Sequence, residues 1–202
     1  MRRFILIGMA MMAALACGRS KTGGFSACEL NILNGTDSIM RVLTIEDSLD
    51  NVVLRAASHD FSLEELMSDE FKKLERMMIA TVTHPSQDGV GIAGPQVGLN
   101  RRIVAVQRFD KEGEPFEVYA NVRIVWLSDS LAYGPEGCLS VPDRRGNVLR
   151  SQQIVIEYAD LASLSHSCDD IPMARDTVSG FTAVIFQHEI DHLEGVLYID
   201  RL

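Results

Sequence analysis

The chain has 202 residues, of which 47% are hydrophobic and 23% charged, so we expect one globular domain with a sizeable core. Its 15 Gly and 6 Pro are too few for a collagen-like or low-complexity chain, and the apolar content excludes wholesale disorder. Acidic residues outnumber basic ones by 28 to 19, which argues against a nucleic-acid partner, because nucleic-acid binding normally needs a basic face. This charge favours a small molecule or a peptide as the partner.

Residues 1–16 have the organisation of a signal peptide. Arg2 and Arg3 precede an apolar run that ends at Leu15, and this run is shorter than the roughly 20 residues of a membrane-spanning helix. Cys17 follows a small-x-small cleavage site, so we expect an exported protein, anchored in a bacterial cell envelope by a lipid on Cys17. Cleavage before Cys17 without lipidation is the alternative. Residues 17–39, rich in Gly, Ser, Thr and Asn, are predicted to form a flexible tether.

Beyond this segment the predicted elements follow one another without a βαβ rhythm. A capping-box pattern at Ser62 and the helical spacing of apolar residues predict one amphipathic helix from about 62 to 82. Short β-rich runs predict strands at 103–106, 116–124 and 154–158. The polar stretch 160–178 is expected to be a long hairpin or loop, and 180–194 a second helix, which Gly195 ends. This order predicts an α+β fold with a mainly antiparallel sheet packed around a central helix.

The second predicted helix carries the pattern His188-Glu189-Ile190-Asp191-His192. Positions four apart share one face of a helix, so His188 and His192 can bind one metal ion through their ring nitrogens. Glu189 lies about 100° around the helix from His188 and can handle the protons of a water molecule beside the ion. The alternative is two solvated histidines on a charged helix surface. The strongly apolar stretch 181–186 disfavours it, because that stretch buries the helix against a core.

Two histidines do not complete a metal site, so a third protein ligand is needed. One large group of zinc proteases uses a downstream histidine, but Tyr198 stands at that position here. Only ten residues follow His192, and Glu194 and Asp200 are their only carboxylates, which favours a ligand upstream. Cys138, in the segment 136–140, which is expected to be a Gly- and Pro-flanked turn, can supply a thiolate. For Cys138 alone, the alternative is a free thiol packed as a small apolar side chain.

A third motif, Gly-Val-Gly-Ile-Ala-Gly-Pro-Gln, spans residues 89–96. It lacks the Lys-Ser/Thr of a P-loop and does not follow a clear strand, so a phosphate-binding loop is disfavoured. Followed by Glu-Gly-Cys-Leu-Ser at 136–140 and Gln-His-Glu-Ile-Asp-His-Leu-Glu-Gly at 187–195, it resembles the three signature motifs of the peptide deformylase family. The resemblance covers about residues 40–202, which are predicted to form the catalytic domain.

The resemblance implies a metal-dependent hydrolase that removes the N-formyl group from formyl-methionyl peptides or proteins. Cys138, His188 and His192 would bind one divalent metal ion. The resemblance implies Fe²⁺, and Zn²⁺ or Ni²⁺ suits the same donors.

The resemblance also assigns the remaining roles. Glu189 would be the general acid and base, and Gln96 with the backbone N–H of Leu139 would stabilise the oxyanion. The residues that would bind the substrate or support the site around it are Val90, Gly91 and Arg145.

Two departures from the family pattern bear on function. Gly94 stands where alanine is usual, so we expect a looser loop around Gln96 and a tolerated Gly94→Ala substitution, unless residue 94 has a left-handed backbone. The export signal is unusual, because new chains are deformylated beside the ribosome. It motivates an alternative function, a surface-tethered protein that binds formyl peptides with little turnover. The intact Glu189 favours the enzyme, since a binding protein needs no proton shuttle.

Two cysteines remain if Cys17 carries a lipid and Cys138 binds a metal. Cys28 and Cys168 would then lie in a compartment that favours disulfides, where they could pair. The alternative is that both are free thiols, Cys28 in the tether and Cys168 in the polar stretch 160–178.

Overall fold

The computed structural model describes residues 24–35, 39–87, 89–165 and 169–202. The helices are α1 (Ala27–Asn34), α2 (Ser48–Leu54), α3 (Leu63–Leu66), α4 (Asp69–Val82) and α5 (Gly180–Leu193), with 3-10 turns η1 (Gly94–Val97), η2 (Leu161–Ser163) and η3 (Tyr198–Arg201). The strands are β1 (Gly91–Ala93), β2 (Ile103–Gln107), β3 (Phe116–Ala120), β4 (Arg123–Leu127), β5 (Leu131–Cys138), β6 (Val141–Ser151), β7 (Gln153–Ala159) and β8 (Met173–Ser179).

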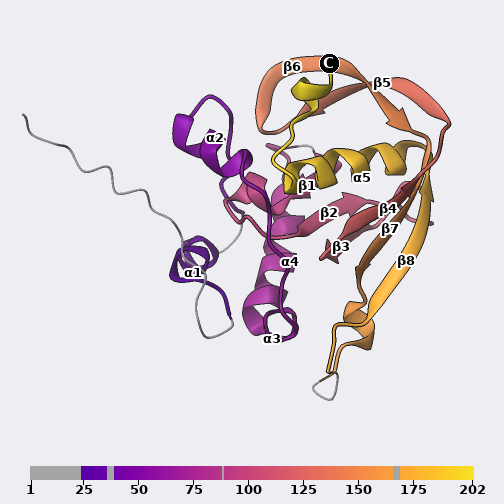
Figure 1. The fold of residues 1–202 in the computed structure, drawn as a ribbon. Helices are drawn as coiled ribbons and strands as arrows, with labels where there is room; N and C mark the ends of the chain where they lie inside the picture. The colour runs from indigo at the N-terminus through magenta and orange to yellow at the C-terminus, as the bar shows by residue number, and fades with distance from the viewer. Residues whose placement is uncertain (1–23, 36–38, 88, 166–168) are drawn as a thin grey trace, which may run out of the picture.

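Three antiparallel sheets surround helix α5. Two have three strands each, in the orders β1-β2-β3 and β4-β7-β8, and the third is the long β5–β6 hairpin. Figure 1 shows α5 between this hairpin and the strands of the other two sheets. Helix α5 contacts β1, β2, β6 and β8. The predicted α+β fold with antiparallel strands around a central helix is confirmed.

Helix α5 is buried on most of its surface, with ten of its 14 residues buried. Its apolar side chains, such as Phe186 and Ile190, pack with β2, β7 and β8, while the polar residues of the histidine motif are carried into the interior. The helix ends as predicted, because Gly195 has a left-handed φ of 72°. A Cβ atom at residue 195 would lie 2.4 Å from the carbonyl oxygen of Arg55, so the close packing also requires glycine.

The helix predicted over 62–82 is two helices, α3 and α4. The capping box at Ser62 is present, with the Glu65 backbone N–H donating to Ser62 Oγ at 3.2 Å and the Ser62 N–H to Glu65 Oε2 at 2.7 Å. A second cap breaks the pattern, because Ser68 Oγ accepts from the backbone N–H of Phe71 at 3.1 Å and starts α4. The apolar face of α4 then packs in one core cluster with residues of β2 and β3.

The prediction of a flexible tether has to be corrected for residues 24–35, which hold α1. Ser26 and Glu29 form a capping box, and Leu33, only 1% exposed, belongs to the same core cluster as α4. Glu29 also forms an ion pair with the buried guanidinium of Arg101. The prediction treated residues 17–39 as one segment rich in Gly, Ser, Thr and Asn, and so overlooked the capping box and the apolar residues that end in Leu33.

The predicted strands at 103–106 and 154–158 are confirmed as β2 and β7. The other strands were predicted only in part or not at all. The stretch 116–124 is two strands that meet at Asn121, whose backbone is left-handed at φ 52°. In the segment predicted as a hairpin or loop, residues 173–179 form β8, which pairs with β7 along its whole length. The β5–β6 hairpin was not predicted, and it places Cys138 at the end of a strand.

Several predictions concern residues outside the described part of the chain. The signal segment with Cys17 and the cysteine at 168 lie there, so lipidation and the Cys28–Cys168 disulfide stay predictions. Among the described helices, none combines the length and the apolar character that crossing a membrane would require.

Candidate active site

Three side chains that commonly bind metals meet between the β5–β6 hairpin and α5. Cys138 ends β5, and His188 and His192 lie one turn apart on α5, as their spacing predicts. The ligand atoms of the three residues lie within 4.8 Å of one another, and Cys138 Sγ is 3.2 Å from Nε2 of His192. The structure thus brings the three predicted metal ligands together.

The surroundings of these donors suit a cation. His188 Nδ1 lies 2.8 Å from Oε2 of Glu136, which leaves its other ring nitrogen for the metal site. Burial lowers the pKa of His188, but hydrogen bonds to Cys138 and Glu136 outweigh burial and raise the pKa to about 10. Positive charge is therefore favoured here. One thiolate and two imidazoles fit a divalent transition-metal ion and leave a position open for water or substrate.

Glu189 lies fully in the interior next to this cluster. Its Oε2 atom is buried and has no hydrogen-bond partner among the described residues. A Cβ atom at residue 91 would lie 2.5 Å from Oε1 of Glu189, so glycine at 91 makes room for the carboxyl group. Burial raises the pKa of Glu189 to about 7, against the opposing effect of His188. A carboxyl group with this pKa can take up and return a proton near neutral pH.

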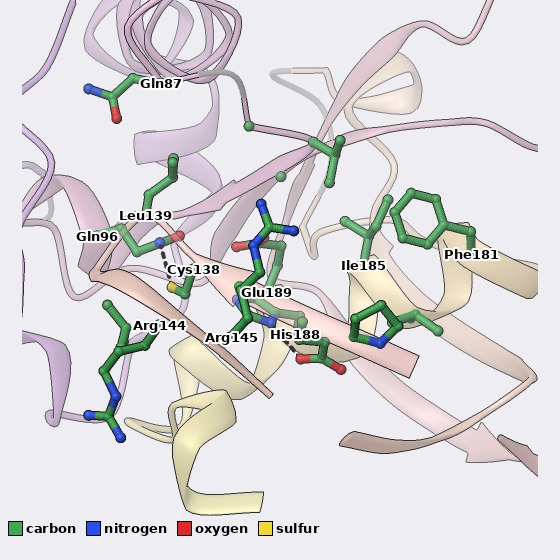
Figure 2. A pocket seen from close by; sticks show the side chains of 18 of the residues that line it. Gln87, Gln96, Cys138, Leu139, Arg144, Arg145, Phe181, Ile185, His188 and Glu189 are labelled. Atoms are coloured by element: carbon green, nitrogen blue, oxygen red, sulfur yellow. Dashed lines mark hydrogen bonds and ion pairs between the residues drawn. The ribbon is translucent and has the colours of Figure 1, made fainter. Parts of the chain in front are cut away.

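Gln96 lies in the 3-10 turn η1, and its amide is oriented by three neighbours. Its Oε1 accepts from the backbone N–H of Ala93 at 2.8 Å, and its Nε2 lies 3.2 Å from Ser140 Oγ and 3.5 Å from Cys138 Sγ. The amide N–H group thus points toward the metal-ligand cluster, as Figure 2 shows. A donor fixed in this way is suited to stabilise an oxyanion that forms beside the cluster.

A cavity of about 870 Å³ opens over this cluster. The predicted site residues that line it are Val90, Gly91, Gln96, Cys138, Leu139, Arg145, His188 and Glu189, whereas His192 is fully buried beneath it. Phe181, Val184 and Ile185 of α5 add apolar surface to its wall. In Figure 2, Gln96, Cys138 and Leu139 lie on one side of the cavity and Phe181 and Ile185 on the other. The cavity joins the reactive cluster to an apolar surface.

Comparison with known proteins identifies the family. The sequence profile of polypeptide deformylases matches residues 39–202. This chain belongs to the peptide deformylase family.

Relatives and solved deformylase structures agree with this assignment. The chain is 38% identical over 161 residues to a peptide deformylase of Leptospira biflexa, covering 76% of this chain and 84% of that one. It is 39% identical over 157 residues to peptide deformylase 2 of Gloeobacter violaceus, covering 77% and 76% of the two chains. A class I type b peptide deformylase from Acinetobacter baumannii superposes with a TM-score of 0.70 at 32% identity, covering 82% of this chain and 100% of that chain. The deformylase from Thermotoga maritima gives 0.68 at 30% identity, covering 82% and 99%.

Sequence reasoning missed the polar residues that surround the deformylase ligand cluster. Arg150 of β6 binds Glu136 through two hydrogen bonds of 2.7 and 3.0 Å, and it also donates to Asp191 of α5 at 2.6 Å. Burial raises the pKa of Glu136, but Arg150 and His188 outweigh it and lower the pKa to about 2. Glu136 stood in the second motif and Asp191 in the third. No signal in the sequence marked Arg150 as their common partner.

Proposed function

We propose that this protein removes the formyl group from N-formyl-methionyl peptides or proteins by metal-dependent hydrolysis. The observation that carries the proposal is the meeting of three donors, Cys138, His188 and His192, with a buried carboxyl group and an oriented amide in one cavity. The resemblance of the motifs and the family of the chain support the same reaction. The alternative of a formyl-peptide binding protein finds no support in the comparisons.

Each polar group of the cavity has a separate task in this reaction. A divalent cation bound by the Cys-His-His set would supply Lewis acidity, lowering the pKa of water from 15.7 toward about 7 and polarising a carbonyl group. Glu189 takes the proton of the attacking water, since its Oε2 has no other partner and its pKa is about 7. Gln96 Nε2 and the backbone N–H of Leu139 stabilise the negative charge that develops on the formyl oxygen. Glu189 then returns the proton to the leaving amine.

The apolar wall of the cavity supports a methionyl side chain as the neighbour of the formyl group. Val90, Phe181, Val184 and Ile185 provide this surface, and they lie on the same cavity as Glu189. An unbranched thioether adapts readily to such a surface. One solved structure of the Acinetobacter baumannii deformylase is bound to Met-Ala-Ser, which is consistent with this type of substrate.

Release of formate from formyl-Met-Ala-Ser by the purified protein tests the proposal. The protein is loaded in separate samples with Fe²⁺, Ni²⁺ and Zn²⁺, and binding of the peptide is measured in parallel. We expect formate release with at least one of these ions. A protein that contains metal and binds the formyl peptide but releases no formate would contradict the proposal and favour the binding protein.

We propose Fe²⁺ as the native ion, on the resemblance to the family. The donor set itself suits Zn²⁺ and Ni²⁺ as well, because relative affinity does not decide which ion is bound in a cell. Elemental analysis after anaerobic purification from the native organism tests this assignment. We expect iron in stoichiometric amount, and stoichiometric zinc or nickel without iron would contradict it.

We also propose that the protein is exported and anchored by a lipid on Cys17. The support comes from the sequence, namely the basic residues 2 and 3, the apolar run up to Leu15 and the position of Cys17. Fractionation of producing cells followed by mass spectrometry of the mature chain tests this. A membrane-bound chain that begins at lipidated Cys17 is expected, and a cytosolic chain that begins at Met1 would contradict it.

A further inference from the structure

A chain of four ionic side chains leads from the proposed metal site to the surface of the molecule. It begins at Glu136, whose Oε2 lies 2.8 Å from Nδ1 of His188. Second partners of this kind fix the orientation of a metal-binding histidine ring. Glu136 uses both of its oxygens, because Arg150 donates to each of them. The side chains of Glu136 and Arg150 are 5% and 4% exposed, so water cannot readily replace these bonds.

Asp191 connects this buried pair to the outside. It lies on α5 between the two metal-binding histidines, and its Oδ2 accepts from Nη1 of Arg150 at 2.6 Å. The guanidinium of Arg150 is therefore shared between Glu136 on its own hairpin and Asp191 on the helix. Because Nε and Nη2 of Arg150 face Glu136 and Nη1 faces Asp191, a shift of the guanidinium toward either carboxylate would move it away from the other.

Arg201 supplies the last link from the turn η3. It donates to Asp191 through Nε at 2.6 Å and through Nη2 at 2.5 Å, and its side chain is 44% exposed. Asp191 thus has one guanidinium on its buried side and one on its solvent side. With both arginines present, the charges of Glu136 and Asp191 are balanced within the chain of four. Without Arg201, Asp191 would hold Arg150 as its one described cationic partner and compete more strongly with Glu136 for it.

The turn η3 touches the metal-ligand helix at a second point. The ring of Tyr198 stacks on the ring of His188, with 6.0 Å between ring centroids and 22° between planes. An ion pair between Asp200 and Arg55 fixes the same turn to the end of α2. The turn therefore contacts His188 directly through Tyr198 and indirectly through Arg201.

We propose that Arg201 and Asp191 are positioning residues of the metal site, which hold Arg150 so that Glu136 fixes the His188 ring. This inference rests on the metal site of the proposed function. It goes beyond that function, because the proposed function gives no role to Arg201 or Asp191. Loss of a second partner typically costs 10- to 100-fold in metal affinity. Because Arg201 is the outermost link, we expect the Arg201→Gln chain to release its metal about 3- to 10-fold faster, and Asp191→Asn about 10- to 100-fold faster.

The experiment measures metal release from the full chain loaded with Co²⁺, by transfer of the ion to a chromophoric chelator. The visible spectrum of bound Co²⁺ reports the ligand geometry, and Tm reports folding. Arg201→Lys, which can keep one bond to Asp191, is expected to fall between the parent and Arg201→Gln. Arg175→Gln is the control for charge, because Arg175 forms an exposed ion pair with Glu157 outside this chain of contacts.

A second control separates the bond to Asp191 from the general attachment of the turn. Arg55→Gln removes the ion pair with Asp200 and leaves the Arg201–Asp191 bonds in place. The proposal is overturned if Arg201→Gln releases Co²⁺ no faster than Arg175→Gln, or if Arg55→Gln releases it as fast as Arg201→Gln. A parent chain that binds no Co²⁺ at all would instead overturn the proposed function, so the two failures are distinguishable.

Discussion

Gly94 occupies a position in which a methyl group has no room. Gly94→Ala was expected to be tolerated unless residue 94 had a left-handed backbone, and its backbone is not left-handed. A Cβ atom at residue 94 would nevertheless lie 2.6 Å from the carbonyl oxygen of Arg101 and 2.7 Å from that of Leu99. The expectation that Gly94→Ala is tolerated is therefore corrected. The glycine tightens the turn before Gln96 and does not loosen it.

We predict that Gly94→Ala destabilises the protein by about 1–3 kcal/mol, the usual cost of overpacking a buried position. It should also slow formate release, because the turn that orients Gln96 must shift. Gly134→Ala is the control, since a Cβ atom there meets nothing within 4 Å, and its effect should stay within about 0.5 kcal/mol. Urea unfolding measures the free energy of unfolding of both variants. Equal values for the two would contradict the close packing at Gly94.

Among the elements, α1 shows that the folded domain begins before the predicted boundary at residue 40. The helix contributes Leu33 to the core beside α4, and its Glu29 pairs with Arg101, which also binds Glu65 of α3 at 2.8 Å. The guanidinium of Arg101 lies over the ring of Phe61 as well, with 5.2 Å to the ring centroid. These contacts make α1 part of the catalytic domain.

We predict that Leu33→Ala lowers the free energy of unfolding by about 2–5 kcal/mol, as expected for a buried leucine. Asn31→Ala on the exposed face of the same helix should change it by less than about 0.5 kcal/mol. Denaturant unfolding of both variants measures the difference. If Leu33→Ala were as stable as Asn31→Ala, residues 24–35 would be a flexible tether after all.

Some elements were predictable because their signal is local. The histidine motif, the apolar stretch before it and the helix-ending Gly195 lie within one short segment and predicted α5 correctly. The hairpin strand β6 contains Pro142, Asp143 and Gly146, which are poor strand formers, so its conformation depends on pairing with β5. The role of Arg150 could not be predicted either, because its partners Glu136 and Asp191 belong to other elements. Motif spacing predicted the reactive residues, whereas the groups that support them become visible in the tertiary structure.

At the scale of the whole molecule, ion pairs join segments that lie far apart in the sequence. Arg101 pairs with Glu29, Arg55 with Asp200, and Arg108 with Asp176. Arg108 also pairs locally with Asp110. Hydrogen bonds to Arg108 and Arg55 lower the pKa values of Asp110 and Asp200. Burial raises the pKa of Glu29, but its bonds to Arg101 outweigh burial and lower it.

These shifts give the direction of the pH dependence of stability. A carboxyl group with a lowered folded-state pKa stabilises the fold above its unfolded pKa, about 3.9 for Asp and 4.3 for Glu, and loses this effect as the pH falls through the folded value. We therefore predict that the free energy of unfolding declines as the pH falls below about 5. Urea unfolding between pH 7 and pH 3 measures it. Glu29→Gln should flatten the decline, and an unchanged slope in that variant would contradict the role of the Glu29–Arg101 pair.

The central claim is that Cys138, His188 and His192 hold a metal ion beside a separate proton-transfer group, Glu189. Metal content and formate release, measured on the same samples of Cys138→Ala and Glu189→Ala, test this claim most directly. We predict that Cys138→Ala loses metal and activity together, because it lacks a ligand. Glu189→Ala should keep its metal and release formate about 10²- to 10⁴-fold more slowly. A Glu189→Ala protein that lost its metal as completely as Cys138→Ala, or that released formate at the parent rate, would contradict the account.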